Sequence, residues 1–307
     1  MKLSVIIASF NRSQSLLHVL QELSHQIVPE GVKWEVLIVD NNSTDGTESV
    51  ISQFVSKDPK RYRYLRENRQ GKSHALNTGI HAAAGEIVVF TDDDCISAPN
   101  WLCAISNEFV SDPALAILGG RVELYCKDDR PVTIRTFRER ILFSKPEQLF
   151  SLIPGCNMSI KKSIFDVVGE FDPLLGPGTK IGAVSEDTDF IYRVFKKGFK
   201  VAYSPDVLVY HNHGRRTEAQ VQSLNHKYVV GRGAFYCKHI LKGDVCVLRM
   251  AYWEVSALIK GLLKERFSGA LARQRKTLLW DLLIGMAYAP SAIRRYLARR
   301  FVMRLLL

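Results

Sequence analysis

Residues 87–94 read IVVFTDDD, a short apolar run that ends directly in three carboxylates. Short runs of Val, Ile and aromatic residues bounded by polar positions are typical of buried β-strands. Three further runs of this kind occur nearer the start of the chain, at Leu3–Ser9, Trp34–Asp40 and Tyr62–Leu65. The pattern predicts a set of buried strands, the fourth of which delivers an acidic cluster at its end.

Helical patterns separate these strands. Leucines spaced three or four positions apart follow Ser13, which we expect to cap a helix between the first two strands. A second pattern covers Ser73–Ala84 between the last two strands, and we expect Gly85 to end it. Alternation of strand and helix is typical of a doubly wound, mostly parallel α/β sheet flanked by helices. We predict this fold class for the first two thirds of the chain.

Two of the predicted strands end in acidic residues, one at Asp40 and one at Asp92–Asp94. In doubly wound sheets, ligands bind outside the carboxyl ends of the strands, where the strand order reverses. Hard cations such as Mg²⁺ and Mn²⁺ favour oxygen ligands and would relieve the repulsion among three adjacent carboxylates. The alternative is an acidic cap on the helix that follows. Since no GxGxxG follows the first strand, a dinucleotide site of the usual kind is disfavoured.

Two histidines, His211 and His213, follow another strand-like run at Val207–Tyr210. One could supply a metal ligand and the other a phosphate contact. Arg215 and Arg216 lie directly behind them and could offset the charge of a diphosphate. The alternative is an ordinary loop with a solvated basic turn.

A second acidic pair, Glu186 and Asp187, begins a predicted helix for which Ser185 is the expected N-cap. Acidic residues in a first turn favour the helix dipole, which is one sufficient reason for their presence. The functional interpretation is a carboxylate base at the edge of a pocket, able to take a proton from an acceptor hydroxyl. Both interpretations stay open on local evidence.

The composition, with 307 residues, 47% hydrophobic and 24% charged, is that of a globular protein with a sizeable core. The six cysteines show neither CxxC pairs nor His-linked zinc spacing, and we interpret them as reduced, mostly buried thiols. The most apolar stretch, Leu278–Ala289, is shorter than the roughly 18 residues of a spanning helix and contains Asp281. We therefore expect a cytoplasmic protein, either free or peripheral on the inner face of the cell membrane.

The formal charge of +11 is concentrated near the C-terminus, where 11 Lys and Arg lie between Leu258 and Leu307 against two acidic residues. After about Arg216 we expect helices, separated at Gly243, Gly261, Gly269 and Pro290. Basic residues interleaved with Trp280, Tyr288 and Phe301 suit the surface of an anionic membrane. The alternative is a helical appendage that packs on the rest of the protein or on a second subunit. No nucleic-acid partner is expected, because no recognisable binding module surrounds these charges.

The motifs together resemble the family 2 inverting glycosyltransferases, which have the GT-A fold. The resemblance covers about Lys2 to Arg216 and rests on the order of SVIIASFN (4–11), VDNNSTDGT (39–47), Asn68 through Asn77-Thr78-Gly79, FTDDD (90–94), GCN (155–157) and ED (186–187). Each piece is short, and their order and spacing carry the assignment. The resemblance implies a catalytic GT-A domain at 1–216 and leaves a basic helical region at 217–307.

The resemblance also implies a role for each matching residue. Nucleotide-sugar binding falls on Phe10, Asp40, Arg69, Lys72, Asp92 and Asp93, and the acceptor side on Gly155 and Asn157. Asp94 and Asp92, with His211 or His213 as a further contact, would hold Mg²⁺ or Mn²⁺. Asp187 would be the catalytic base, with Glu186 beside it.

The implied reaction transfers a sugar from a nucleotide-sugar donor to a hydroxyl of a carbohydrate or lipid-linked acceptor, with inversion of configuration. The family resemblance suggests a place in bacterial cell-surface polysaccharide or glycolipid synthesis. The alternative is a catalytically silent nucleotide-sugar-binding or scaffold protein, which would keep Asp40 but need not keep Asp187.

Overall fold

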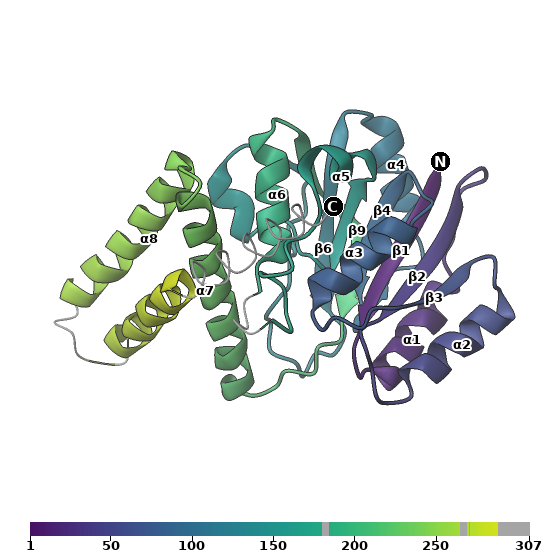
Figure 1. Cartoon of the computed structure of the whole chain (residues 1–307), viewed down its shortest axis with the longest axis horizontal. Helices are drawn as coiled ribbons and strands as arrows, with labels where there is room; N and C mark the ends of the chain where they lie inside the picture. The colour runs from purple at the N-terminus through teal and green to yellow at the C-terminus, as the bar shows by residue number, and fades with distance from the viewer. Residues whose placement is uncertain (180–183, 265–268, 270, 288–307) are drawn as a thin grey trace, which may run out of the picture. The chain divides into compact units, whose positions relative to one another are not determined.

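The computed structural model describes residues 1–179, 184–264, 269 and 271–287. The chain forms two units (Figure 1). The first consists of Met1–Phe171 and Asp187–Thr217, and the second of Asp172–Glu186 and Glu218–Leu307. The chain therefore leaves the first unit after Phe171 and re-enters it at Asp187.

A nine-stranded sheet runs through the first unit (Figure 1), in the order β3-β2-β1-β4-β8-β6-β9-β5, and β7 pairs with β9 outside this path. The strands are β1 (Lys2–Ser9), β2 (Lys33–Asp40), β3 (Tyr62–Arg66), β4 (Ile87–Asp92), β5 (Cys95–Ser97), β6 (Leu115–Leu124), β7 (Ile141–Leu142), β8 (Asn157–Lys161) and β9 (Lys200–His211). The pairings within β3-β2-β1-β4 and between β6 and β9 are parallel, whereas β8 runs antiparallel to both β4 and β6. Because β5 and β7 are also antiparallel to β9, the sheet is mostly parallel with three reversed strands.

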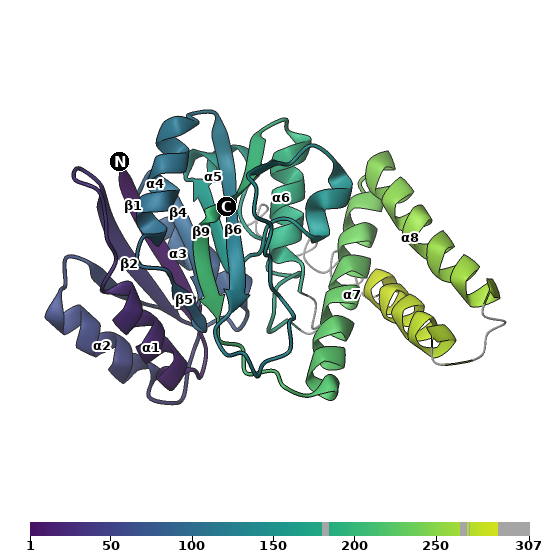
Figure 2. The ribbon, with the colours of Figure 1, turned by 180° about the vertical axis from the view of Figure 1, so that it is seen from behind.

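Helices cover both faces of this sheet (Figures 1 and 2). They are α1 (Ser13–Leu23), α2 (Thr47–Lys57), α3 (Lys72–Ala82), α4 (Trp101–Ser111), α5 (Ser163–Val168) and α6 (Glu186–Lys196), with a 3₁₀ turn η1 (Pro146–Phe150). Successive residues of a strand point to opposite faces. Ile7 of β1 shares a core cluster with Leu16 of α1, whereas Ile6 faces α3, where a Cβ added to Gly79 would lie 2.6 Å from its side chain. The predicted α/β fold class is confirmed.

Two of the expected helix ends are wrong. Ser13 is the first residue of α1, and Arg12 occupies the N-cap position without a side-chain capping bond. Helix α3 ends at Ala82, before Gly85. Gly85 instead lies against β1, because an added Cβ would be 2.6 Å from the backbone nitrogen of Ser4. Helix α2 was not predicted from the sequence patterns.

The carboxyl ends of the first strands meet as expected. In the ladder, Ser9 at the end of β1 pairs with Asp40 of β2, and Ala8 pairs with Asp92 of β4. Because β1 lies between β2 and β4, the strand order reverses at β1, and this reversal opens a crevice for ligands in sheets of this type. Just beyond β1, Asn11 has a left-handed φ of 52°, a conformation that asparagine tolerates better than most residues.

The second unit is helical. It contains α7 (Glu218–Ile240), α8 (Val245–Lys264) and a helix over 271–287. The last helix packs closely on α7, because a Cβ added to Gly285 would lie 2.0 Å from the carbonyl oxygen of Val230. Gly243, with φ of 76°, separates α7 from α8 as expected, but Gly261 lies inside α8 and the expectation for it is wrong.

The segment that precedes Asp187 is held on α7 within this second unit. Ser185 Oγ donates a hydrogen bond to the carbonyl of Gly231, and Lys238 Nζ forms an ion pair with Asp172 at 2.7 Å. Leu175 shares a small apolar cluster with residues of the same helix. Helix α7 therefore anchors the segment at both of its ends.

Part of the predicted basic helical region lies outside the described residues. Pro290 and the aromatic and leucine residues from position 288 onward lie outside the described residues, as do Arg294 and Arg304. Among the described helices, none has both the length and the apolar composition needed to cross a membrane.

Candidate active site

The three aspartates at the end of β4 have three different sets of partners. Asp92 Oδ1 accepts a hydrogen bond from Lys72 Nζ at 2.5 Å. Asp93 is buried and accepts a hydrogen bond from Ser9 Oγ at 2.7 Å. Burial, together with the charge of neighbouring Asp94, raises the pKa of Asp93 to about 7. These separate partners limit the repulsion among the three carboxylates, and they turn Asp93 toward the end of β1.

Asp94 lies between a histidine and an arginine. Its Oδ1 atom is 3.2 Å from His211 Nε2, and its Oδ2 atom is 3.3 Å from Arg12 Nη1. Burial by itself would raise the pKa of Asp94, but the hydrogen bond and charge of His211, with Arg12, lower it to about 2. Burial likewise works against protonation of His211, yet Asp94 raises the pKa of that imidazole to about 9. The pair is therefore ionic across the neutral range in this structure.

This pair has the donor chemistry of a divalent-cation site. Thr133 Oγ1 lies 2.9 Å from Nδ1 of His211 and fixes the ring, so that Nε2 faces Asp94. A carboxylate oxygen and an imidazole nitrogen at this separation can share one ion, and Mn²⁺ accepts both kinds of ligand. Asp92, two positions earlier at the end of β4, would add an oxygen if it left Lys72. The residues present fit the metal that the family resemblance implies.

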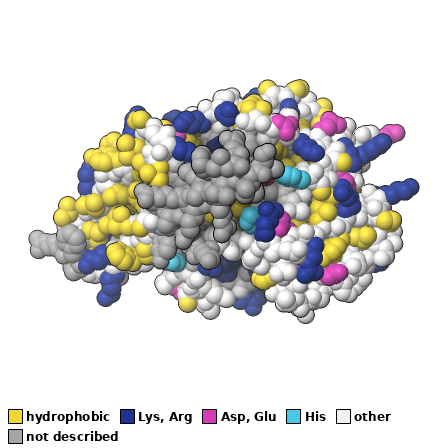
Figure 3. All heavy atoms as spheres, in the orientation of Figure 1, with side chains coloured by type: hydrophobic (Ala, Val, Ile, Leu, Met, Phe, Trp, Pro, Cys, Tyr) yellow, Lys and Arg dark blue, Asp and Glu magenta, His cyan; other side chains and the backbone are white. Residues whose placement is uncertain are grey.

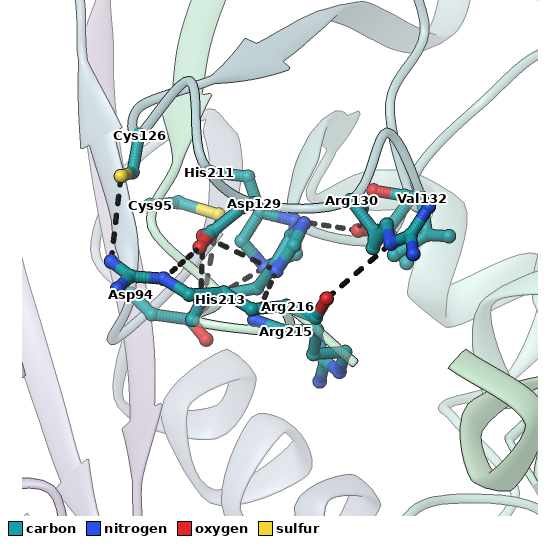
Figure 4. Close-up of polar contacts among 12 residues, drawn as sticks. Asp94, Cys95, Cys126, Asp129, Arg130, Val132, His211, His213, Arg215 and Arg216 are labelled. Atoms are coloured by element: carbon teal, nitrogen blue, oxygen red, sulfur yellow. Dashed lines mark hydrogen bonds and ion pairs between the residues drawn. The ribbon is translucent and has the colours of Figure 1, made fainter. Parts of the chain in front are cut away.

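Asp129 organises the loop that carries the two histidines, although no sequence pattern pointed to it. Its side chain is fully buried and accepts hydrogen bonds from Gly214 N at 2.9 Å and Arg216 Nε at 3.2 Å (Figure 4). Arg130 N also donates to the carbonyl of Arg215 at 2.8 Å. The loop after β6 is therefore tied to the loop after β9, and Asp129 neutralises part of the basic charge there.

The structure distinguishes the two histidines. His213 Nδ1 accepts a hydrogen bond from the backbone N–H of Arg215 at 3.0 Å, and it also lies 3.5 Å from Asp129. In the neutral ring the proton then belongs on Nε2, which is buried and has no hydrogen-bond partner among the described residues. Burial and the charge of His211 lower the pKa of His213. His213 thus offers a hydrogen-bond donor, whereas His211 offers a nitrogen that faces a carboxylate.

The nucleotide side of the predicted site lies at the end of β2. Asp40 is fully buried, and its carboxylate accepts hydrogen bonds from Ser43 N at 2.8 Å and Tyr64 Oη at 3.1 Å. Phe10, at the end of β1, is 45% exposed despite its apolar ring, which leaves a surface for stacking. Arg69 is largely exposed and forms an ion pair with Glu67 at 2.6 Å.

Asn41 shapes the loop that precedes Lys72. Its amide nitrogen donates to the carbonyls of Glu67 and Arg69, and its amide oxygen accepts from the N–H of Gly71. Gly71 has a φ of 134°, which favours glycine, and α3 begins at the next residue. Asn41 therefore positions Lys72 beside Asp92.

On the acceptor side, Gly155 and Asp187 are in close contact. A Cβ added to Gly155 would lie 2.6 Å from Asp187 Oδ2, so the carboxylate occupies space that only glycine leaves free. The other oxygen of Asp187 accepts a hydrogen bond from the N–H of Thr188 at 2.6 Å, and Glu186 is buried. The next residue after Gly155 is Cys156, whose sulfur lies within 4.8 Å of a ring nitrogen of His211. These contacts bring the predicted base to the neighbourhood of the predicted metal ligands.

Asn157 holds the sheet together at this point. It is fully buried, and its amide nitrogen donates to the carbonyls of Arg121 and Val207. Its amide oxygen accepts from Trp101 Nε1 at 2.9 Å. Since the amide already makes three hydrogen bonds inside the protein, its observed role is to join β8 to β6, β9 and α4.

Comparison with known proteins adds sequence and fold evidence. The sequence model described as glycosyl transferase family 2 matches residues 4–169. Glycosyltransferase AglE of Haloferax volcanii is 27% identical over 214 residues, which is 68% of this chain and 66% of that protein. The GalNAc(5)-diNAcBac-PP-undecaprenol beta-1,3-glucosyltransferase of Campylobacter jejuni is 39% identical over 95 residues, 30% of this chain and 29% of that protein. The chain thus matches less than two thirds of the length of these relatives.

A solved structure has the same fold. The mannosyltransferase PcManGT of Pyrobaculum calidifontis, in complex with GDP-Man and Mn²⁺, aligns with a TM-score of 0.61 and 19% identity, over 94% of this chain and 86% of that chain. The structural likeness supports the GT-A fold, and the sequence match covers more than half of the chain. On this evidence the chain belongs to glycosyl transferase family 2.

Proposed function

We propose that the protein is an inverting glycosyltransferase that uses a nucleotide-sugar donor and a divalent cation. The observation that carries the proposal is the meeting of Asp92, Asp94 and His211 beside Asp40 at the carboxyl edge of the sheet. A fold supports many activities, so the argument rests on this arrangement of side chains. The solved relative that contains GDP-Man and Mn²⁺ supports a nucleotide sugar and a metal as ligands of such a fold.

The nucleotide is held at the ends of β1 and β2. Asp40 is preorganised to accept hydrogen bonds from a base or ribose, because two protein donors already fix its carboxylate. Phe10 lines the same pocket. Lys72, which reaches Asp92, and the exposed Arg69 supply positive charge toward the diphosphate. Asp92 contacts the ribose, and Asp93 supports this site from inside through Ser9.

Asp94 and His211 hold the cation, Mg²⁺ or Mn²⁺, with Asp92 as an additional ligand. When bound, a divalent cation stabilises the negative charge that develops on the leaving diphosphate. His213, with a free N–H on Nε2, is suited to donate to a phosphate oxygen. With a cation bound, Arg12 would remain near enough to Asp94 to offset part of the negative charge of the site.

Asp187 acts as the base. It accepts the proton of the acceptor hydroxyl while the hydroxyl oxygen attacks the anomeric carbon from the side opposite the diphosphate. The bond from the anomeric carbon to the diphosphate oxygen breaks in the same step, and the nucleoside diphosphate leaves with the bonding electrons. Configuration at that carbon is inverted. Gly155 leaves the space that Asp187 occupies, and Glu186 lies next to it in the first turn of α6.

The acceptor is a carbohydrate or a lipid-linked saccharide, in polysaccharide or glycolipid synthesis at the bacterial cell surface. The Campylobacter jejuni relative is named for an undecaprenol-linked acceptor, which supports the lipid-linked case. Helix α8 exposes a stripe formed by Leu248, Tyr252, Ile259 and Leu263, with Trp253 beside it. Figure 3 shows hydrophobic side chains gathered over this helix. Such a stripe on a basic unit suits peripheral contact with the anionic inner face of a membrane.

A donor screen tests the proposal. The full chain is incubated with UDP-, GDP- and dTDP-sugars and Mn²⁺ or Mg²⁺, and release of the nucleoside diphosphate is measured with candidate acceptors. One donor class should give turnover that a chelator abolishes and that Asp94→Asn abolishes with the fold retained. Asp187→Asn should bind that donor normally and lose roughly two or more orders of magnitude in rate. Donor binding without turnover under every condition would favour a silent binding or scaffold protein.

A further inference from the structure

Two cysteines lie inside the candidate active site and have no part in the proposed reaction. Cys95 directly follows Asp94, and Cys156 directly follows Gly155. Both thiols are buried. Cys95 is the first residue of β5 and Cys156 directly precedes β8, so the two residues are far apart in the sequence. The ligand atoms of Cys95, Cys156 and His211 all lie within 4.8 Å of one another.

The two sulfur atoms lie within 4.8 Å of each other. A hydrogen bond from the thiol of Cys95 lowers the pKa of Cys156, whereas burial raises the pKa of Cys95. In tetrahedral zinc sites, sulfur lies about 2.3 Å and imidazole nitrogen about 2.0 Å from the metal, so two sulfur ligands of one ion are about 3.8 Å apart. Atoms within 4.8 Å of one another therefore need shifts of about 1 Å or less to surround a zinc ion.

Asp94 lies beside two of these three residues and is the candidate for a fourth ligand. Asp94 Oδ1 is 3.2 Å from His211 Nε2 and 3.9 Å from Cys95 Sγ. Figure 4 shows Asp94, Cys95 and His211 side by side. The hydroxyl of Thr133 holds the other nitrogen of His211 and orients the ring, as the outer-shell partner of a metal-bound histidine does. Cysteine sulfur, histidine nitrogen and carboxylate oxygen are all ligands that Zn²⁺ accepts in a tetrahedral site.

Charge balance favours zinc in this buried position. Two thiolates neutralise a divalent ion, so that the ion and its sulfur ligands together carry no net charge and burial costs little. The carboxylate of Asp94 adds one negative charge, which Arg12 offsets at 3.3 Å. Mg²⁺ and Mn²⁺ prefer oxygen ligands and gain little from sulfur, whereas softer ions gain most.

We propose that Cys95, Cys156, His211 and Asp94 form an inhibitory site for Zn²⁺ or another thiol-seeking divalent cation. Binding releases the two thiol protons and the proton of the His211 imidazolium to solvent, and it leaves the oxidation states unchanged. The inhibitory effect rests on the proposed function, because it arises from the withdrawal of Asp94 and His211 from the catalytic cation. Zinc binding itself does not depend on that function.

Cobalt substitution tests the site without an enzyme assay. Co²⁺ is added to the full-length metal-free protein under a non-thiol reductant, and the absorption spectrum is recorded. Thiolate ligation produces intense sulfur-to-cobalt charge-transfer absorption in the near ultraviolet, and Zn²⁺ should displace it at one equivalent. Cys156→Ser should weaken or abolish this absorption, whereas Cys103→Ser, on the half-buried face of α4, should leave it intact.

Competition measurements supply the affinities. Zn²⁺ binding is followed against a chromophoric chelator. Loss of an outer-shell partner lowers metal affinity roughly 10–100-fold. Cys156→Ser removes a direct ligand and should therefore lower the zinc affinity by at least this factor. Thr133→Val should lower it within that range. The same titration in an excess of Mn²⁺ should leave most of the zinc bound, since zinc exceeds manganese in the usual order of affinities.

The inhibition arm uses the donor found in the screen. Zn²⁺ should reduce turnover measured with Mn²⁺. The Zn²⁺ concentration that halves the rate should be at least tenfold higher for Cys156→Ser than for the wild-type protein, and unchanged for Cys103→Ser. Cobalt bound by the wild-type protein without charge-transfer absorption overturns the site, whether or not the variants fold. A normal cobalt spectrum with Zn²⁺-resistant turnover overturns inhibition alone. A normal cobalt spectrum with no turnover from any donor supports the metal site and counts against the proposed function.

Discussion

Gly155→Ala gives a sharp test of Asp187 as the base. The added methyl group would lie 2.6 Å from Asp187 Oδ2 and 3.2 Å from its Cβ and Cγ, whereas ordinary contacts begin at 3.4 Å. The carboxylate must therefore retreat by about 0.8 Å. A misplacement of about 1 Å in a reacting group can cost up to about 10²-fold in rate. We expect kcat to fall by about one to two orders of magnitude while donor affinity stays within about twofold.

The assay compares single and double variants. Rates come from release of the nucleoside diphosphate, donor affinity from equilibrium titration, and the fold from circular dichroism and thermal unfolding. In the Asp187→Asn background, Gly155→Ala should cost little more, because the base that it displaces is already lost. Gly46→Ala is the matched control, since its added Cβ meets only Ser13 at 3.7 Å and its φ is −72°. A folded Gly155→Ala protein with the wild-type kcat would refute the placement of the base.

Three further outcomes follow from the described contacts. Because the pKa of Asp93 is about 7 in the folded protein against 3.8 in the unfolded chain, the contribution of Asp93 to the free energy of unfolding should fall as pH rises from about 4 to about 7 and change little above; Asp93→Asn should lessen that fall in chelator-treated protein, measured by urea unfolding. Asp129→Ala should lower the free energy of unfolding by about 1–3 kcal/mol, because Gly214 N and Arg216 Nε lose their hydrogen-bond acceptor. The same change should raise the KM for the nucleotide sugar more than it lowers kcat. An unchanged unfolding curve would count against the anchoring role of Asp129. Tyr252→Glu with Trp253→Glu should reduce co-sedimentation with anionic vesicles at low salt, and equal, negligible binding before and after substitution would exclude α8 as a membrane contact.

The fold was predictable from the sequence where the pattern was local. The run IVVFTDDD and the strand ending at Asp40 predicted a buried parallel sheet. They also predicted the edge at which its acidic residues meet, because the carboxyl ends of neighbouring parallel strands lie at the same edge of the sheet. The reversed strand β8 was less visible. Its insertion between β4 and β6 brings Cys156 to Cys95, a contact that no local pattern encodes.

The site was predictable in its acidic residues and less so in its supporting contacts. Asp129 is separated from Gly214 and Arg216 by more than 80 positions, and an isolated aspartate in a loop carries no motif. The arrangement of the two histidines depends on which ring nitrogen meets a backbone N–H, and such a choice exists only in the folded chain. Asn157 has a motif position, but no local pattern predicts the three hydrogen bonds that its amide makes inside the protein.

Residues 172–186 belong to the helical unit, and this has a consequence for recombination between relatives of this family. Ser185 bonds to Gly231 of α7, and the predicted base follows only two positions later. A C-terminal helical region taken from a relative would have to reproduce the surface of α7 that contacts residues 172–186. Without these contacts, the chain before Asp187 is no longer held in place. Recombination at a simple boundary near position 217 would therefore produce chimaeras with intact sheets and poorly placed bases, whereas exchanging 172–186 together with the helices would preserve the fit.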